Sequence, residues 1–299
     1  MALPSFFVLM AIGFVAQLVD GSLGMAYGVS TSTLLLGVGL APALASAAIH
    51  IAEVGTTAFS AASHWRFGNV DRDKILWLGV PGALAAFCGA VALSSLSAEA
   101  ARPWVAAILA GLGVYILVRF AFRGRSAPVV ERPIRPRFLV PLALTAGFMD
   151  ALGGGGWGPI ATPTLVASGR MQPARVVGTV DASEFLVALG ASAGFLVSLD
   201  VHQVPWIIVG ALLAGGVVAA PLAAFLVRLV PVRIMGTAVG GIILVTNART
   251  LLQALDLKPD AVYLAIGILW LAALVQAVAL TRRERVRGRS PARSMSTGD

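Results

Sequence analysis

The sequence contains few charged residues and almost no cysteine. Only 12% of its 299 residues are Asp, Glu, Lys or Arg, whereas 58% are hydrophobic. This balance predicts a polytopic membrane protein rather than a soluble domain with a large core. The single cysteine, Cys88, lies in an apolar run, which excludes a disulfide framework and a thiolate metal site. Three scattered histidines do not form a metal cluster, and we expect no metal and no cofactor.

Motifs of several enzyme classes are also missing. The sequence has no nucleophile elbow, and the glycine run at 153–156 lacks the lysine of a P-loop. A net charge of +8 would by itself suit a nucleic-acid partner, but the basic residues lie in short connections and in the C-terminal segment. We therefore expect neither an enzyme nor a nucleic-acid-binding protein. The lipid bilayer and a small anion are the partners we predict, while the oligomeric state is left open.

Apolar segments of helical length follow one another along the whole chain. They fall at 4–19, 23–40, 43–63, 75–97, 103–122, 138–152, 157–168, 174–199, 204–227, 233–253 and 260–280. Most are close to the roughly 20 residues with which a helix crosses a bilayer. The four short segments form two pairs, and each pair flanks a glycine-rich break. These features predict an all-α membrane protein with two interrupted helical hairpins.

The halves of the chain resemble each other at an offset of 130 to 131 residues. The matching pairs include Asp20 and Asp150, Tyr27 and Trp157, Pro42 and Pro173, and Glu53 and Glu184. We interpret this register as a duplication. It divides the chain into a first membrane repeat at 1–122, a basic cytoplasmic linker at 123–137, a second repeat with one extra helix at 138–281, and a disordered basic tail at 282–299.

Basic residues decide the orientation of the two hairpins. If each hairpin enters and leaves on one face of the membrane, 19 of the 22 Lys and Arg residues lie on the cytoplasmic side, as the positive-inside rule requires. If residues 138–168 cross only once, the basic residues divide equally between the two sides. The first arrangement gives the repeats opposite topology. Inverted repeats with interrupted helices are typical of transporters that bind their substrate near mid-membrane.

The two breaks are candidate anion-binding sites. A helix that begins after a glycine-rich break offers free N–H groups and a positive dipole end, and glycines let an anion approach them. The alternative is that these glycines only permit close helix packing. The candidate substrate-binding residues are Gly21, Ser22, Gly24, Tyr27, Gly153, Gly154, Gly155, Gly156 and Trp157.

Acidic residues accompany both breaks and both of the spans that follow. Asp20 and Asp150 directly precede the breaks, where a carboxylate either caps the backbone or carries a coupling proton. Glu53 and Glu184 lie about 15 Å into their spans, and intramembrane acids are costly and usually functional. The alternative for these glutamates is a structural role that clamps helices together. His50 and Asp181 lie three residues before them, on the same helical face.

Three segments carry a resemblance to a known family. They read AQLVDGSLGMAYG, GFMDALGGGGWGPIATPTL and RMQPARVVGTVDASEF, and they resemble the TauE/SafE family of sulfite and organosulfonate exporters. The resemblance spans residues 5–280 and implies an inner-membrane permease for a small sulfur-containing oxyanion such as sulfite or sulfoacetate. The first half has DGSLG where the second has a glycine run, so the two breaks are not equivalent in sequence.

Three functions remain open at this point. The first is a secondary transporter that exports such an anion, driven by the proton gradient or by the membrane potential. The second is a passive anion channel that uses the same glycine-lined site. The third is a membrane enzyme or an assembly protein for a partner complex, which would need catalytic ligands or a large polar face. Acids within both repeats favour coupled transport over passive flow.

Overall fold

Eleven helices and no strand make up the described part of the chain. A computed structural model describes residues 5–23, 25–122, 132–226, 232–254 and 260–289. The helices are α1 (Phe6–Leu23), α2 (Tyr27–Gly37), α3 (Pro42–Arg66), α4 (Arg72–Ser94), α5 (Ala98–Phe122), α6 (Pro136–Gly153), α7 (Trp157–Ala167), α8 (Pro173–Ser198), α9 (Trp206–Leu226), α10 (Val232–Ala254) and α11 (Asp260–Arg289). The predicted all-helical fold and the order of its segments are confirmed.

Prolines and glycines set several of the helix boundaries. Pro42, Pro136 and Pro173 each occupy the first turn of a helix, where the missing N–H is not needed. Gly39 follows α2 with a φ of 95°, and Gly169 follows α7 with a φ of 63°; glycine adopts this left-handed conformation at no steric cost. The boundaries therefore follow from local backbone chemistry.

Two helix pairs are interrupted where the sequence has its breaks. The chain leaves α1 at Leu23 and resumes as α2 at Tyr27, and it leaves α6 at Gly153 and resumes as α7 at Trp157. Helices α2 and α7 each have 11 residues. At 1.5 Å per residue they are about 16 Å long, roughly half of the hydrocarbon thickness of a bilayer. Neither can span a membrane alone.

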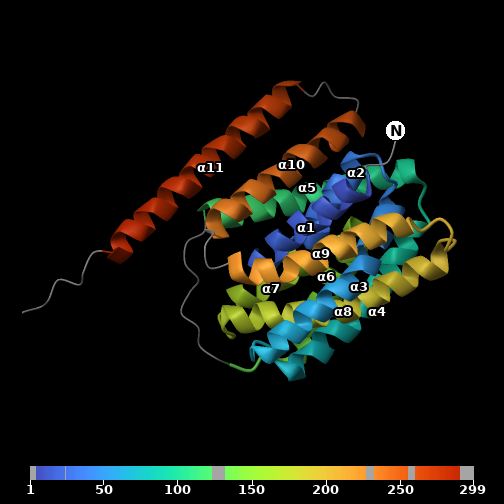
Figure 1. The fold of residues 1–299 in the computed structure, drawn as a ribbon, viewed down its shortest axis with the longest axis horizontal. Helices are drawn as coiled ribbons and strands as arrows, with labels where there is room; N and C mark the ends of the chain where they lie inside the picture. Colours follow the sequence, from blue (N-terminus) through green and yellow to red (C-terminus); the bar gives the residue numbers. More distant parts are fainter. Residues whose placement is uncertain (1–4, 24, 123–131, 227–231, 255–259, 290–299) are drawn as a thin grey trace, which may run out of the picture.

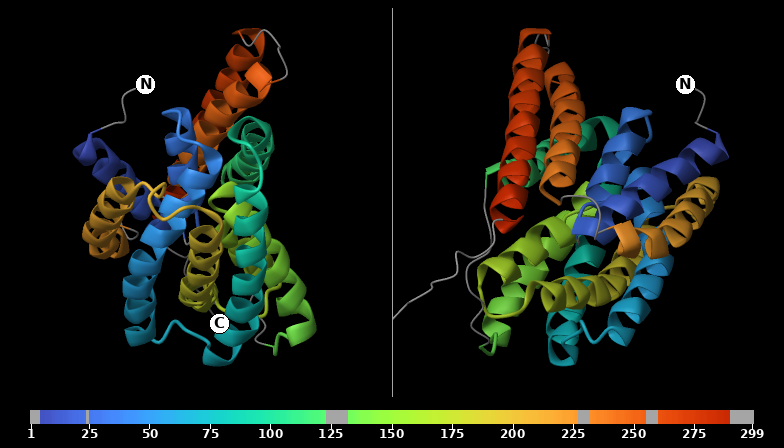
Figure 2. Two further views of the ribbon diagram at one scale, coloured as in Figure 1. Left: turned by 90° about the vertical axis from the view of Figure 1, so that its right-hand side faces the viewer. Right: turned by 60° about the vertical axis from the view of Figure 1, so that its left-hand side comes forward.

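The helices pack in a regular set of pairs (Figure 1). Helix α1 packs against α9, and α6 packs against α4. Helices α3 and α8 pack against each other and also against α9 and α4 respectively, while α5 packs against α10. Helix α11 lies beside α10 at the edge of the molecule, as Figure 2 also shows.

Outer helix faces present large apolar side chains. Four described helical segments are long and apolar enough to cross a membrane: Arg72–Ser94, Ala98–Phe122, Arg175–Ser198 and Leu264–Arg283. On α11, Leu264, Leu269 and Val275 are each 67 to 70% exposed. Apolar surface of this extent suits contact with lipid rather than water. The architecture is that of a helical, multi-pass membrane protein.

Two of the predicted segments are the linker at 123–137 and the C-terminal tail at 282–299. Residues 123–131 of the expected linker and residues 290–299 of the expected tail lie outside the described residues. Helix α11 continues to Arg289, so the first part of the segment 282–299 is helical, although we expected disorder from residue 282 onward. The basic residues at its start continue the helix because Arg and Glu are good helix formers.

Candidate functional site

The two breaks meet each other in the interior of the molecule. A Cβ atom added to Gly28 would lie 2.5 Å from the carbonyl oxygen of Gly154 and 2.6 Å from Cα of Gly155. The Ser32 hydroxyl donates a hydrogen bond of 2.7 Å to the Gly153 carbonyl. The glycines of one half therefore allow its backbone to touch the backbone of the other half. Close packing is what these glycines achieve in this structure.

Asp150 holds the start of α7. Its Oδ1 atom accepts hydrogen bonds from the N–H groups of Gly156, at 2.6 Å, and Trp157, at 2.9 Å. The N–H of Gly155 donates to the backbone carbonyl of Asp150 at 3.0 Å. The backbone donors at which we expected an anion thus converge on one carboxylate oxygen of the protein itself.

The first break has a similar but weaker arrangement. Oδ1 of Asp20 accepts a hydrogen bond of 3.2 Å from the N–H of Tyr27, the first residue of α2. Gly21 and Ser22 lie in the last turn of α1, and Gly24 lies outside the described residues. Both aspartates therefore make hydrogen bonds of the kind that a capping role requires.

His50 links the first half to Asp150. Its Nε2 atom lies 3.0 Å from Oδ2 of Asp150, and its Nδ1 atom lies 2.8 Å from the Ser46 carbonyl oxygen. A carbonyl only accepts, so Nδ1 carries a hydrogen, and one further proton lies between Nε2 and the carboxylate. His50 is 0% exposed and Asp150 is 2% exposed. The two side chains form a buried, hydrogen-bonded pair.

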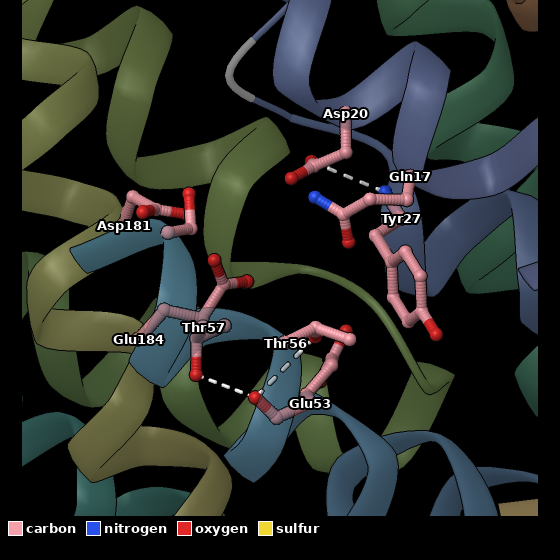
Figure 3. A pocket seen from close by; sticks show the side chains of 9 residues that line it. Gln17, Asp20, Tyr27, Glu53, Thr56, Thr57, Asp181 and Glu184 are labelled. Carbon is pink, nitrogen blue, oxygen red and sulfur yellow. Dashed lines mark hydrogen bonds between the residues drawn. The ribbon is translucent and has the colours of Figure 1, made fainter. Parts of the chain in front are cut away.

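A small cavity of about 10 Å³, close to the room that one water molecule or one small ion needs, lies beside this pair (Figure 3). Four of the acids singled out in the sequence line it: Asp20, Glu53, Asp181 and Glu184. They come from α1 and α3 in the first half and from α8 in the second. The structure therefore gathers acids from both halves around one space, although they are separated by as many as 164 positions in the chain.

Neutral polar residues complete the cavity wall. Gln17, Tyr27, Thr56, Thr57 and Ser60 line it, and only Tyr27 was singled out from the sequence. The missed residues follow a readable pattern, because Gln17 lies three residues before Asp20, and Thr56 and Thr57 lie three and four residues after Glu53. Residues at this spacing share a helix face.

Trp157 and Tyr27 have different surroundings despite their equivalent positions. Trp157 is 0% exposed, its Nε1 donates to the Val180 carbonyl at 3.0 Å, and its ring lies against Gly82. It belongs to the packed core and is absent from the residues that line the cavity. Tyr27 does line the cavity, and its hydroxyl donates to the Leu212 carbonyl at 3.4 Å.

His50, Glu53 and Asp150 come together more closely than the sequence suggested. One potential ligand atom from each lies within 4.8 Å of the others. Both ring nitrogens of His50 and both carboxylate oxygens of Asp150 already have hydrogen-bond partners. Oε2 of Glu53, by contrast, is buried and has no hydrogen-bond partner among the described residues. The His50–Asp150 pair thus acts as a polar clamp between the halves.

Interrupted helices, apolar outer faces and an internal polar cavity are features of a class, that of helical multi-pass membrane transporters. The model of the sulfite exporter TauE/SafE family matches residues 9–250, and the chain belongs to this family. The chain is also 48% identical, over 270 residues, to the probable membrane transporter protein YtnM of Bacillus subtilis. That alignment covers 88% of this chain and 89% of the relative. No solved structure matches the chain.

Proposed function

We propose that this protein is a secondary transporter, and not an enzyme, that exports a small sulfur-containing oxyanion such as sulfite or sulfoacetate. Membership of the TauE/SafE sulfite exporter family and the likeness to a probable membrane transporter support transport as the activity. The observation that supports an anion as the substrate is the pair of N–H groups that converge on Asp150. They lie 2.6 and 2.9 Å from one carboxyl oxygen at a helix N-terminus.

The anion binds, in this proposal, by taking the place of the Asp150 carboxylate. An oxyanion oxygen needs the same donors and the same dipole end that Asp150 uses here. Gly154 and Gly155 touch Gly28 across the two halves, so the anion enters when the halves separate. The break near Ser22 and Tyr27 then forms the opposite wall, and Asp150 and Asp20 close the breaks when no anion is bound.

Two inverted repeats provide the alternating access. The helix contacts support a two-fold relation, because α1 packs on α9 as α6 packs on α4, and α3 with α8 and α5 with α10 pair across the halves. Each repeat comprises a broken hairpin and three further helices, and α11 is additional. We place 123–137 and the C-terminus on the cytoplasmic face of the inner membrane, as the basic residues indicate.

The membrane potential supplies a driving force for export. The inside of the cell is negative, so each elementary charge that leaves gains about 2.3 kcal/mol per 100 mV. Coupling to protons through Glu53 and Glu184 adds a second source, since both acids line the cavity between the halves. These two sources predict different responses to a potential and to a pH gradient.

Flux from proteoliposomes tests the proposal. Vesicles are loaded with ³⁵S-labelled sulfite or sulfoacetate, and a potassium diffusion potential is imposed at constant pH. We expect efflux above that of protein-free vesicles, faster with the potential inside-negative, and accelerated by unlabelled substrate on the other side. That last effect, trans-stimulation, requires a carrier, so its absence would indicate a channel. Efflux equal to that of empty vesicles would contradict the proposal.

A further inference from the structure

The cavity beside the breaks has the chemistry of a cation site. The groups that line it are four carboxylates, one amide, one phenol and three aliphatic hydroxyls, with no lysine, arginine or histidine. The polar groups of its wall therefore present mostly oxygen atoms. Carboxylate, carbonyl and hydroxyl oxygens are the ligands that hard cations such as sodium and calcium take in proteins.

Several of its hydroxyl hydrogens point away from the empty space. Thr57 donates to the backbone carbonyl of Glu53 at 2.5 Å, and Tyr27 donates to the Leu212 carbonyl at 3.4 Å. Once these hydrogens are used, the oxygen lone pairs are what remains for a ligand. An anion would find few donors here, whereas a cation would find acceptors. This separates the cavity from the N–H groups that Asp150 occupies.

Two carboxylate oxygens in the cavity lack any partner among the described residues. They are Oε2 of Glu53, whose residue is 2% exposed, and Oδ2 of Asp181, whose residue is 8% exposed. Figure 3 shows both side chains among those that line the cavity, together with Asp20 and Glu184. Leaving a buried polar atom unpaired is costly, and more so for a charged group. Such atoms call for a ligand.

The internal duplication indicates which kind of ligand is missing. The acid before the second break, Asp150, pairs with the ring of His50, a group that carries a positive charge when protonated. The equivalent acid before the first break is Asp20, and the position equivalent to His50 holds Asp181. Asp181 thus occupies the position at which the other half has His50, the group that can supply a positive charge. A bound cation would supply that charge and relieve the repulsion between the two acids.

We propose that this cavity binds a hard metal cation, sodium or calcium, through the carboxylates of Asp20, Glu53, Asp181 and Glu184. The neutral oxygens of Thr56, Thr57 and Gln17 complete the shell. The cation contacts residues of α1, α3 and α8. It therefore links the two halves at the position where the duplicated arrangement lacks a histidine. Its binding is measured without any flux, so the test of the cation site is separate from the test of transport.

Thermal stability of the purified, full-length protein in detergent tests this site. Tm is measured in choline chloride against increasing NaCl or CaCl₂ at constant ionic strength and constant pH. A ligand that binds only the folded state raises Tm with the logarithm of its concentration. We expect such a rise with sodium or calcium, and the two titrations identify which ion binds. Choline and potassium serve as the reference salts.

Variants assign the effect to the cavity. Asp181→Asn and Glu184→Gln keep the side-chain shape, and each should weaken the apparent affinity by roughly tenfold or more, equivalent to about 1.4 kcal/mol. Asp73→Asn and Glu99→Gln change the same groups at exposed sites on α4 and α5 and should titrate like the parent. If one cavity variant fails to fold, the other gives the answer.

Three results would overturn the proposal. They are a Tm that does not respond to either metal ion, a response that both cavity variants retain, and a Tm that responds to acid but not to metal ions. The last result would mean that protons alone neutralise the carboxylates. Anion flux with no metal effect would leave the proposed transport intact and reject the cation site, whereas metal binding without flux would do the reverse.

Discussion

Replacing Gly155 with alanine is the sharpest structural test of how the breaks work. Gly155 has a φ of 157°, which L residues rarely adopt, and an added Cβ would collide with the backbone of Gly28 and Val29. Unfavourable backbone costs about 1–3 kcal/mol and overpacking another 1–3 kcal/mol. Together they should lower the free energy of unfolding by about 2–6 kcal/mol.

The assay is Tm of the purified protein without substrate, followed by flux. At roughly 2–4 °C per kcal/mol, the loss corresponds to a Tm lowered by at least roughly 4 °C. Gly111→Ala on α5 is the control, because a Cβ there meets nothing within 4 Å. It should leave Tm unchanged or raise it slightly, since alanine favours helix by about 0.5–1 kcal/mol.

The outcome separates packing from anion approach. If Gly155 contacts the other half as described, Tm falls before any substrate is added. If its only role were to leave room for an anion, the alanine variant would keep the parent Tm and lose flux alone. A variant with both Tm and flux of the parent would refute the reasoning about the break. Gly155→Leu should abolish transport in inserted protein on either account.

Three further predictions concern coupling, capping and topology. Glu53→Gln and Glu184→Gln should keep anion binding, measured as thermal protection by substrate, and lose the response of flux to a pH gradient at fixed potential; an unchanged response in both would exclude proton coupling through these glutamates. Asp150→Asn should lower the free energy of unfolding by about 1–3 kcal/mol, seen as a lower Tm, because the bonds at the start of α7 weaken; a parent-like Tm would exclude the capping role. Single cysteines at positions 136 and 170, in a cysteine-free background, should react with a membrane-impermeant reagent from the cytoplasmic face only; labelling from opposite faces would reject the hairpin.

The helices were predictable because their signals are local. Apolar run length gave the segments, and proline or glycine marked their ends, so the expected 43–63 became α3 (Pro42–Arg66) and the expected 157–168 became α7 (Trp157–Ala167). The C-terminal helix was underestimated because its last turns are charged, and charge was interpreted as a tail. Helix propensity favours Arg and Glu there, against the weaker compositional argument.

The site was predictable only in part, because its members meet through tertiary packing. Their equivalent depths in oppositely oriented repeats indicated that Glu53 and Glu184 could face one central cavity, but nothing in the sequence placed Asp20 there with them. The ring of Trp157 lies in the core because Gly82 leaves room for it, a contact between residues 75 positions apart. That Asp150 of α6 occupies the N-terminus of α7 depends on the path of the backbone through the break. Such relations depend on coordinates rather than on sequence pattern.

The position of a bound anion tests the central claim most directly. Selenite has the shape and charge of sulfite and an anomalous X-ray signal from selenium, so crystals of the protein grown with selenite would locate it. The account predicts an anomalous peak within hydrogen-bond distance of the N–H groups of Gly156 and Trp157, with the Asp150 carboxylate moved away from them. A peak elsewhere, with Asp150 still bonded to both N–H groups, would contradict it.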